Sequence, residues 1–278
     1  MAPTGDKQYH LILSIDFGET NSAICYALIP KGMPPEDILP ENVETVTSYP
    51  NSPLNRKGDP MRLEAATEMV YPRGTKFRSL AELVTNEPMN NLVMDSGYEV
   101  DATDETEIEE LSDRPLWGEE AHAHFSKCSS HSDNSMCLVG GFKKMFDRSG
   151  MHSAHNDRLI ENLRINFGQG IPMEKFSPDK VIHSITVDYL TCILHHAKNF
   201  IILKHGGIYG KRPNIVSTET VICVPITWRQ KAYRDLQSCM TVAMKLARFP
   251  GVSLEGNIIE KVMLLSEPES GALWLLSG

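Results

Sequence analysis

Residues 10–22, HLILSIDFGETNS, decide the fold of this chain. The apolar residues Leu11, Ile12, Leu13 and Ile15 lead directly into Asp16 and then into a short polar turn, and a second apolar run, residues 23–28 (AICYAL), follows at once. Two apolar runs joined by a short polar turn predict two buried strands that form a tight hairpin.

The turn of this hairpin carries chemistry that suits a phosphate group. Asp16 is a carboxylate at the end of a strand, Gly18 permits close approach of the backbone, and Thr20 and Asn21 add a hydroxyl and an amide. Phosphate cradles use backbone N–H groups turned toward the anion and a carboxylate that holds the metal or its waters. The same pattern also occurs in hairpins that bind nothing, so the turn alone leaves both interpretations open.

Composition and charge narrow the class of protein. With 278 residues and 31.1 kDa the chain can form one large domain or two. The net charge of −9 leaves no basic footprint for nucleic acid or for an anionic membrane. Residues 1–10 have no signal-peptide core, and the six cysteines form no C-x-x-C pair. We therefore expect a cytoplasmic protein with neither nucleic acid nor membrane as a partner.

The first half of the chain is predicted to be irregular. Prolines crowd residues 30–60, which favours loops and short edge strands. Residues 43–49 and 63–71 have the alternation or apolarity of strands. The acidic residues 85–113 are poor in apolar periodicity and predict a solvated loop.

The second half alternates helices and strands. Ser177 is a good N-cap and Pro178 suits the first helical position, and apolar residues then recur every three or four positions. This alternation predicts an α/β sheet with parallel strands. The predicted elements are helices at 178–204 and 228–247, strands at 219–224 and 261–266, and a last helix from 267.

Four segments, in this order, carry a resemblance to one family: DFGETNS (16–22), FSPDKV (176–181), VICVPITW (221–228) and LLSEPESGAL (264–273). The first resembles the phosphate loop D-[LF]-G-T-T-x-S of the actin-like ATPases, especially the DnaK-type heat-shock chaperones. The others resemble the helix start, the strand ending in V-P and the E-P-T segment of those chaperones. Trp228 and the spelling Ser-Glu-Pro-Glu look closer to the divergent heat-shock-like ATPases common in fungi.

The resemblance implies the fold class and a division of the chain. It implies an α/β actin-like ATPase (ribonuclease H-like) lobe, a mixed sheet flanked by helices, with a long irregular insert. Residues 8–50 would begin lobe I with the phosphate-loop hairpin, residues 51–175 would be an inserted smaller subdomain with the acidic loop, and residues 176–278 would complete the lobe. No second phosphate loop (D-x-G-G-G-T) is present, so we expect a truncated nucleotide-binding domain that resembles the first lobe only.

The resemblance also implies the cofactors, ATP and Mg²⁺, and the roles of the turn. Asp16 would hold the magnesium shell, and Gly18, Thr20 and Asn21 would face the β- and γ-phosphates. In residues 142–145 (FKKM), Lys143 would reach the γ-phosphate and orient the attacking water, and Lys144 is the alternate if the register shifts by one.

Two further roles come from the same resemblance. Glu267 would lie near the magnesium waters and position the nucleophilic water. Pro225 would relay the nucleotide state to a substrate domain. The implied chemistry is in-line phosphoryl transfer to water, in which positioning and charge stabilisation do most of the catalysis.

Glu19 departs from the family pattern, which has threonine at this position. A carboxylate about 4 Å from a phosphate charge is repelled by roughly 4 kcal/mol at an effective dielectric constant near 20. Glu19 must therefore turn to the metal or away from the phosphate, or nucleotide binding is impaired. Together with the missing second lobe, this leaves the ATPase activity uncertain, and we expect the isolated chain to be inactive.

Three functions are consistent with these features. The first is the ATP-binding lobe of a heat-shock-chaperone-like ATPase, with ATP and ADP as ligands and with hydrolysis coupled to protein folding when complete. A longer form would add unfolded client proteins or co-chaperones as partners. The second is a non-catalytic pseudo-ATPase or interaction module of the same fold. The third, a sugar or acetate kinase, would need a substrate-binding acid or amide after the hairpin, and residues 30–60 offer no such pattern.

A metal site is a further alternative. His122, His124, Cys128, His131 and Cys137 fall within sixteen residues. Zinc ligands are usually arranged as two tight pairs, and here only His122 and His124 are tightly spaced. These two share one face of a strand but not of a helix.

Overall fold

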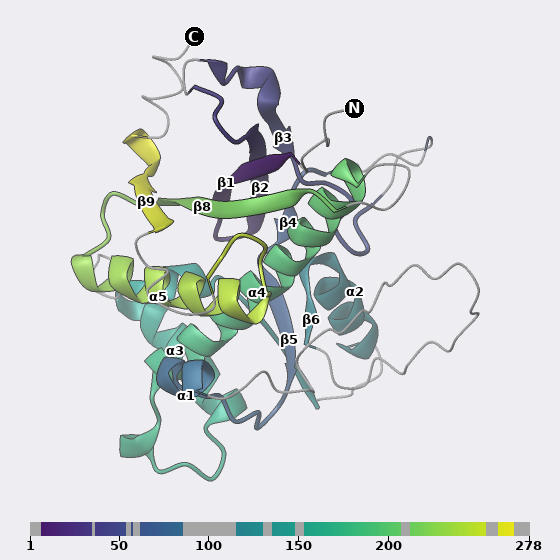
Figure 1. The fold of residues 1–278 in the computed structure, drawn as a ribbon. Helices are drawn as coiled ribbons and strands as arrows, with labels where there is room; N and C mark the ends of the chain where they lie inside the picture. The colour runs from purple at the N-terminus through teal and green to yellow at the C-terminus, as the bar shows by residue number, and fades with distance from the viewer. Residues whose placement is uncertain are drawn as a thin grey trace, which may run out of the picture.

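The computed structural model describes residues 7–34, 37–53, 57, 62–85, 115–129, 135–147, 153–206, 212–253 and 261–269. Within these residues the protein is an α/β structure with a mixed sheet flanked by helices (Figure 1). None of the described helices combines the length and the apolarity that crossing a membrane requires.

The main sheet has six strands in the order β3-β2-β1-β8-β9, with β4 paired to β2. The hairpin of β1 and β2 is antiparallel, whereas β8 is parallel to β1 and β9 is parallel to β8. The predicted hairpin and the predicted parallel strands of the second half are therefore confirmed. The strands are β1 (Gln8–Phe17), β2 (Asn21–Pro30), β3 (Val43–Thr45), β4 (Ala65–Ala66), β8 (Asn214–Val224) and β9 (Val262–Ser266).

Two long helices, α4 (Pro178–His205) and α5 (Gln230–Leu246), lie side by side on one face of this sheet (Figure 1). Helix α4 begins where the sequence predicts, because Ser177 Oγ accepts a hydrogen bond from the backbone N–H of Lys180 at 3.3 Å and Pro178 needs no such partner. Its apolar face is buried against the sheet.

Residues 62–175 contain more regular structure than the sequence indicates. Strand β5 (Glu68–Pro72) pairs in antiparallel fashion with β6 (Leu116–Trp117) and β7 (Met136–Gly140), which gives a second sheet of three strands. The prediction of a long irregular insert is thus wrong for the described residues, because the pairing joins strands far apart in the sequence. The predicted acidic loop lies outside the described residues from 86 onward.

The remaining helices surround these sheets. Helix α2 (Gly118–Ser129) packs on β5, and α3 (Ser153–Phe167) and α1 (Leu80–Thr85) contact α4. Within the described residues, short 3-10 helices connect the elements at η2 (Pro40–Asn42), η3 (Phe142–Phe146) and η4 (Met173–Lys175).

One hydrophobic core joins the two sheets. The ring of Tyr189 on α4 lies 6.1 Å from the ring of Phe17 on β1, 5.8 Å from that of Phe142 on η3 and 6.1 Å from that of Trp117 on β6, measured between centroids. All four side chains belong to the same buried cluster. The second sheet therefore packs on the same core as the hairpin, and the division at residues 50 and 175 stays a prediction.

The parallel register brings three strand ends to one edge of the main sheet. Ile15 pairs with Ile222, and Val224 pairs with Ser266. The residues that follow these strands, which are the turn at 18–20, Pro225 and Glu267, consequently emerge at the same edge. This is the edge at which ligands bind in open α/β sheets.

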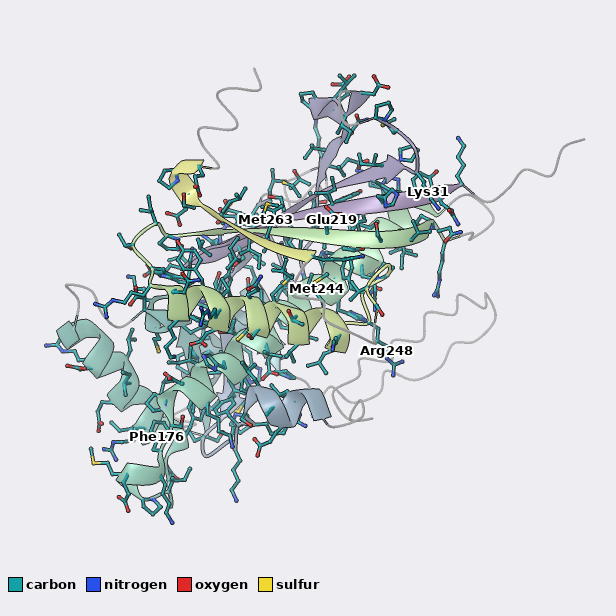
Figure 2. The ribbon with its side chains drawn as sticks, turned by 60° about the vertical axis from the view of Figure 1, so that its left-hand side comes forward. Lys31, Phe176, Glu219, Met244, Arg248 and Met263 are labelled. Atoms are coloured by element: carbon teal, nitrogen blue, oxygen red, sulfur yellow. The ribbon has the colours of Figure 1, made fainter. Side chains whose placement is uncertain are left out.

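The sheet face opposite the two helices is exposed in the described part of the chain. Met263 is 58% exposed, and Ser14, Asp16 and Glu219 are exposed beside it. Figure 2 shows Glu219 and Met263 along the strands and Met244 on α5 below them.

Candidate functional site

A lysine and a glutamate from distant parts of the sequence meet at the edge where the strands end. Lys143 Nζ on η3 lies 3.5 Å from Oε1 of Glu267, the residue directly after β9. The side chain of Lys143 is 8% exposed and that of Glu267 is 57% exposed. The two residues that the sequence assigned to one site are therefore in contact.

A second ion pair forms beside the first. The ammonium group of Lys144 contacts the carboxylate of Glu19 in the hairpin turn, and both side chains are partly exposed. The sequence analysis considered Glu19 only as a charge facing phosphate and did not predict this pair. The only feature of the sequence that indicates this ion pair is the opposite charge of Glu19 and Lys144.

The position of both lysines follows from the geometry of η3. Gly141 has φ +65°, a left-handed conformation that glycine adopts without strain, and it turns the chain out of β7. Phe142 and Met145 then point into the core at the three-residue spacing of a 3-10 helix. Lys144, between them, is left at the surface toward the hairpin turn.

The hairpin turn is held in one conformation. A Cβ added to Gly18 would lie 1.9 Å from the carbonyl oxygen of Asn21, so only glycine fits there. The backbone N–H of Thr67 donates to the carbonyl oxygen of Thr20 at 2.8 Å, and the hydroxyl groups of Thr67 and Ser22 lie 2.8 Å apart. The turn is thus fastened to the start of the second sheet.

Asp16 stands apart from the two ion pairs. It lies at the end of β1, opposite Ala23, and its side chain is exposed on the outer face of the sheet. Across the described ranges Asp16 forms no ion pair with a lysine or an arginine. The structure thus brings Glu19, Lys143, Lys144 and Glu267 into contacts and leaves Asp16 without one.

Pro225 lies in a turn that is tied to α5. The carbonyl oxygen of Pro225 accepts hydrogen bonds from the hydroxyl of Tyr233 and from the backbone N–H of Trp228, both at 3.2 Å. The backbone N–H of Arg229 donates to Asp147 Oδ2 at 2.9 Å, just after η3. Sequence reasoning missed Tyr233 and Asp147, because neither belongs to a motif.

An imidazole next to η3 adds no positive charge at neutral pH. His183 lies against Phe146, with 5.7 Å between ring centroids, and its Nε2 is 3.4 Å from Oδ2 of Asp235. Burial lowers the pKa of His183 below its ordinary value, and the nearby carboxylate of Asp235 only partly opposes this. Among the described residues, the cations beside the turn are therefore Lys143 and Lys144.

The alternative zinc site finds no support in the described residues. His122 and His124 lie on helix α2 rather than on a strand, so they point to different sides, and Cys137 lies on β7. Within the described ranges no three histidine, cysteine, aspartate or glutamate side chains gather as metal ligands. The side chain of Cys128 and the whole of His131 lie outside the description.

No protein-family model matches the chain, and no curated protein matches it either.

Proposed function

We propose that this chain is the ATP-binding lobe of a heat-shock-chaperone-like ATPase of the actin-like superfamily, acting in the cytoplasm. The observation that carries the proposal is the 3.5 Å contact between Lys143 Nζ and Glu267 Oε1. The resemblance assigns these two residues, from separate segments, to one phosphate site. The mixed sheet with its hairpin and two parallel strands is compatible with a ribonuclease H-like lobe.

The side chains at this edge fit a magnesium nucleotide. Lys143 and Lys144 would contact the phosphates, because ammonium groups form strong charge-assisted hydrogen bonds with phosphate oxygens. The turn from Gly18 to Asn21 would approach the phosphates with its backbone, and Asp16 would hold Mg²⁺ or its waters. ATP would supply the phosphoryl group, and Glu267 would position the water that accepts it.

In this proposal, the carboxylate of Glu19 competes with a phosphate group for the ammonium group of Lys144. Its carboxylate already contacts Lys144, so a phosphate group must displace it to gain that ammonium group. Glu19 is partly exposed, which leaves it room to turn away into solvent. The proposal thus predicts weak nucleotide binding that strengthens when the carboxylate is removed.

The same ion pairs favour a second candidate function, a non-catalytic interaction module. Each of the two lysines faces a carboxylate, so the two ammonium charges are balanced without a ligand. In a pseudo-ATPase the pairs would hold the fold together and would leave the surface to a protein partner. In the first candidate, Pro225 would link the nucleotide to clients or co-chaperones through its contacts with α5.

Equilibrium binding of a fluorescent ATP analogue with Mg²⁺ separates the two candidates. Lys143→Gln should abolish binding, Asp16→Asn should weaken it in the presence of Mg²⁺, and Glu19→Thr should strengthen it about tenfold, the equivalent of 1.4 kcal/mol. The matched controls are Lys175→Gln and Glu174→Thr, which change the same residue types on the exposed helix η4.

The outcomes point in opposite directions. Binding that follows this order, with unchanged controls, supports the ATP-binding lobe. Undetectable binding by the wild type and by Glu19→Thr, with both proteins folded by circular dichroism, would reject it in favour of the interaction module.

A further inference from the structure

A second concave site lies at the opposite end of the main sheet. A cavity of about 630 Å³ opens where β1 and β8 begin and where α4 ends, and its walls include Lys7, Tyr9, His205 and Arg212. Because β1 and β8 are parallel, this end is the one farthest from the hairpin turn. Its volume falls in the range of cavities that hold small organic ligands.

One carboxylate in the wall of this cavity, that of Glu44, is already paired with basic side chains. Glu44 contacts the ammonium group of Lys204, its Oε1 lies 3.5 Å from Nε2 of His205, and its Oε2 accepts a hydrogen bond from the hydroxyl of Tyr26 at 3.1 Å. Burial favours a higher pKa for Glu44, but the hydrogen bonds from Lys204 and Tyr26 outweigh it and lower the pKa. Glu44 is therefore ionised and already neutralised.

Two cations in the same wall have no such counter-charge. Lys7 and Arg212 form no ion pair with any residue that the structure describes. Glu41 also lines the cavity, yet it pairs with neither of them. Two positive groups that face one hollow without a carboxylate partner form a site for an anion, because an opposite charge in the cavity would relieve their repulsion.

The positive charge extends beyond the cavity wall. Lys198 on α4 donates from Nζ to the carbonyl oxygen of Ala247 at 2.7 Å, and its pKa is lowered by burial and then by the charges of Arg248 and Arg212. Figure 2 shows Arg248 at the end of α5, on the same side of the molecule as Lys31. In a chain of net charge −9, this end concentrates positive charge.

We propose that this cavity binds a small organic anion through Lys7 and Arg212. The guanidinium group of Arg212 offers two parallel N–H donors, which match the oxygens of a phosphate or of a carboxylate. The aromatic ring of Tyr9 in the wall would contact the carbon skeleton of the ligand. Glu41 limits the affinity, since its charge opposes that of the ligand. The proposal does not depend on ATP binding at the opposite end of the sheet.

Isothermal titration calorimetry on the whole chain tests this site with inorganic pyrophosphate and, separately, with citrate. Arg212→Gln and Lys7→Gln should each weaken binding roughly tenfold, the loss expected for one charge-assisted hydrogen bond. Glu41→Gln should tighten it. The matched control is Lys31→Gln, an exposed lysine whose Nζ donates to Gln8 Oε1 at 2.8 Å and which does not line the cavity.

A second control separates this cavity from the hairpin turn. Arg212→Gln should weaken the binding of both anions to the same extent in a Lys143→Gln background, in which the hairpin turn lacks its proposed phosphate-binding lysine, and the probe that binds more tightly identifies the ligand as a phosphate or a carboxylate. The proposal is overturned if neither probe binds, if Arg212→Gln and Lys31→Gln have the same effect, or if Arg212→Gln has no effect in the Lys143→Gln background.

Discussion

The indole of Trp228 stacks on the ring of Phe146, with centroids 5.7 Å apart and 19° between the ring planes. Phe146 is the last residue of η3, the helix that carries both lysines of the candidate site, and Trp228 lies in the turn before α5. The ring of Tyr233 packs edge-on against the indole of Trp228, with 6.3 Å between the ring centroids. The stack therefore fixes η3 against the turn that contains Pro225.

We predict that Trp228→Ala lowers the free energy of unfolding by about 2 kcal/mol. Truncation of a fully buried tryptophan costs about 3–5 kcal/mol, and Trp228 is only partly buried. Chemical denaturation followed by circular dichroism measures the loss. Trp228→Phe keeps an aromatic ring over Phe146 and should retain most of the stability; equal losses in both variants would contradict the role of the stack.

A buried carboxyl group predicts how stability depends on pH. Asp188 on α4 accepts a hydrogen bond from the hydroxyl of Tyr71 at 2.8 Å, and burial raises its pKa from 3.8 to about 6 although Tyr71 and Arg78 oppose the shift. Between pH 4 and 6 the folded protein therefore binds more protons than the unfolded chain, so its stability falls as the pH rises through this window.

Asp188→Asn should remove this slope. Asparagine has nearly the same shape and can still accept from Tyr71, but it carries no charge to bury. At pH 7 we expect the variant to be more stable than the wild type by up to about 3 kcal/mol, and at pH 4 to be equally stable. Urea denaturation at a series of pH values measures the difference. A constant difference across the series would show that the charge of Asp188 is not responsible.

Two buried tyrosines, one on β5 of the second sheet and one on α4, should respond in opposite ways to loss of their hydroxyl groups. The hydroxyl of Tyr189 is buried beside the hydroxyls of Ser22 and Thr67, but among the described residues it forms no hydrogen bond of normal geometry, whereas that of Tyr71 donates to Asp188. Tyr189→Phe removes an unsatisfied polar group and should raise the free energy of unfolding by about 1 kcal/mol, while Tyr71→Phe should lower it by about 2 kcal/mol. Thermal and urea denaturation of both variants test the contrast, which fails if Tyr189→Phe is the less stable of the two.

Gly18 should tolerate no side chain. Gly18→Ala would place a Cβ 1.9 Å from a backbone oxygen, so the hairpin turn must shift, at a cost of about 2 kcal/mol or more. Gly140→Ala is the matched control, because its Cβ would make ordinary van der Waals contacts, the nearest with the side chain of Glu68 at 3.4 Å. Denaturation midpoints should therefore fall strongly for Gly18→Ala and little for Gly140→Ala. Similar midpoints would mean that the turn can adapt.

The sequence predicted the helices and strands that are determined by neighbouring residues, such as a helix cap or an apolar run. Ser177 and Pro178 fixed the start of α4, and the two apolar runs around the turn gave β1 and β2. Strand β8 begins at Asn214, five residues before its predicted start at 219, because its pairing with β1 extends it through residues 214–218 (NIVST), in which apolar and polar residues do not alternate.

Contacts across the chain could not be predicted in the same way. Strand β5 is completed by β7, which lies more than sixty residues later, and two- to five-residue strands carry too little pattern to reveal such partners. The motifs named Lys143 and Glu267 for one site, and they lie 3.5 Å apart, yet the pairing of Glu19 with Lys144 depends on side-chain directions that follow only from the fold.

Helix α4 links the two ends of the molecule as one continuous helix. Its 28 residues extend about 42 Å. Midway along it, Tyr189 supports Phe17 and Phe142 beneath the hairpin turn, and at its last residue His205 forms part of the far cavity. A helix of continuous backbone hydrogen bonds does not stretch, so any sliding of α4 along its axis displaces the rings beneath the hairpin turn and the wall of the far cavity by the same length.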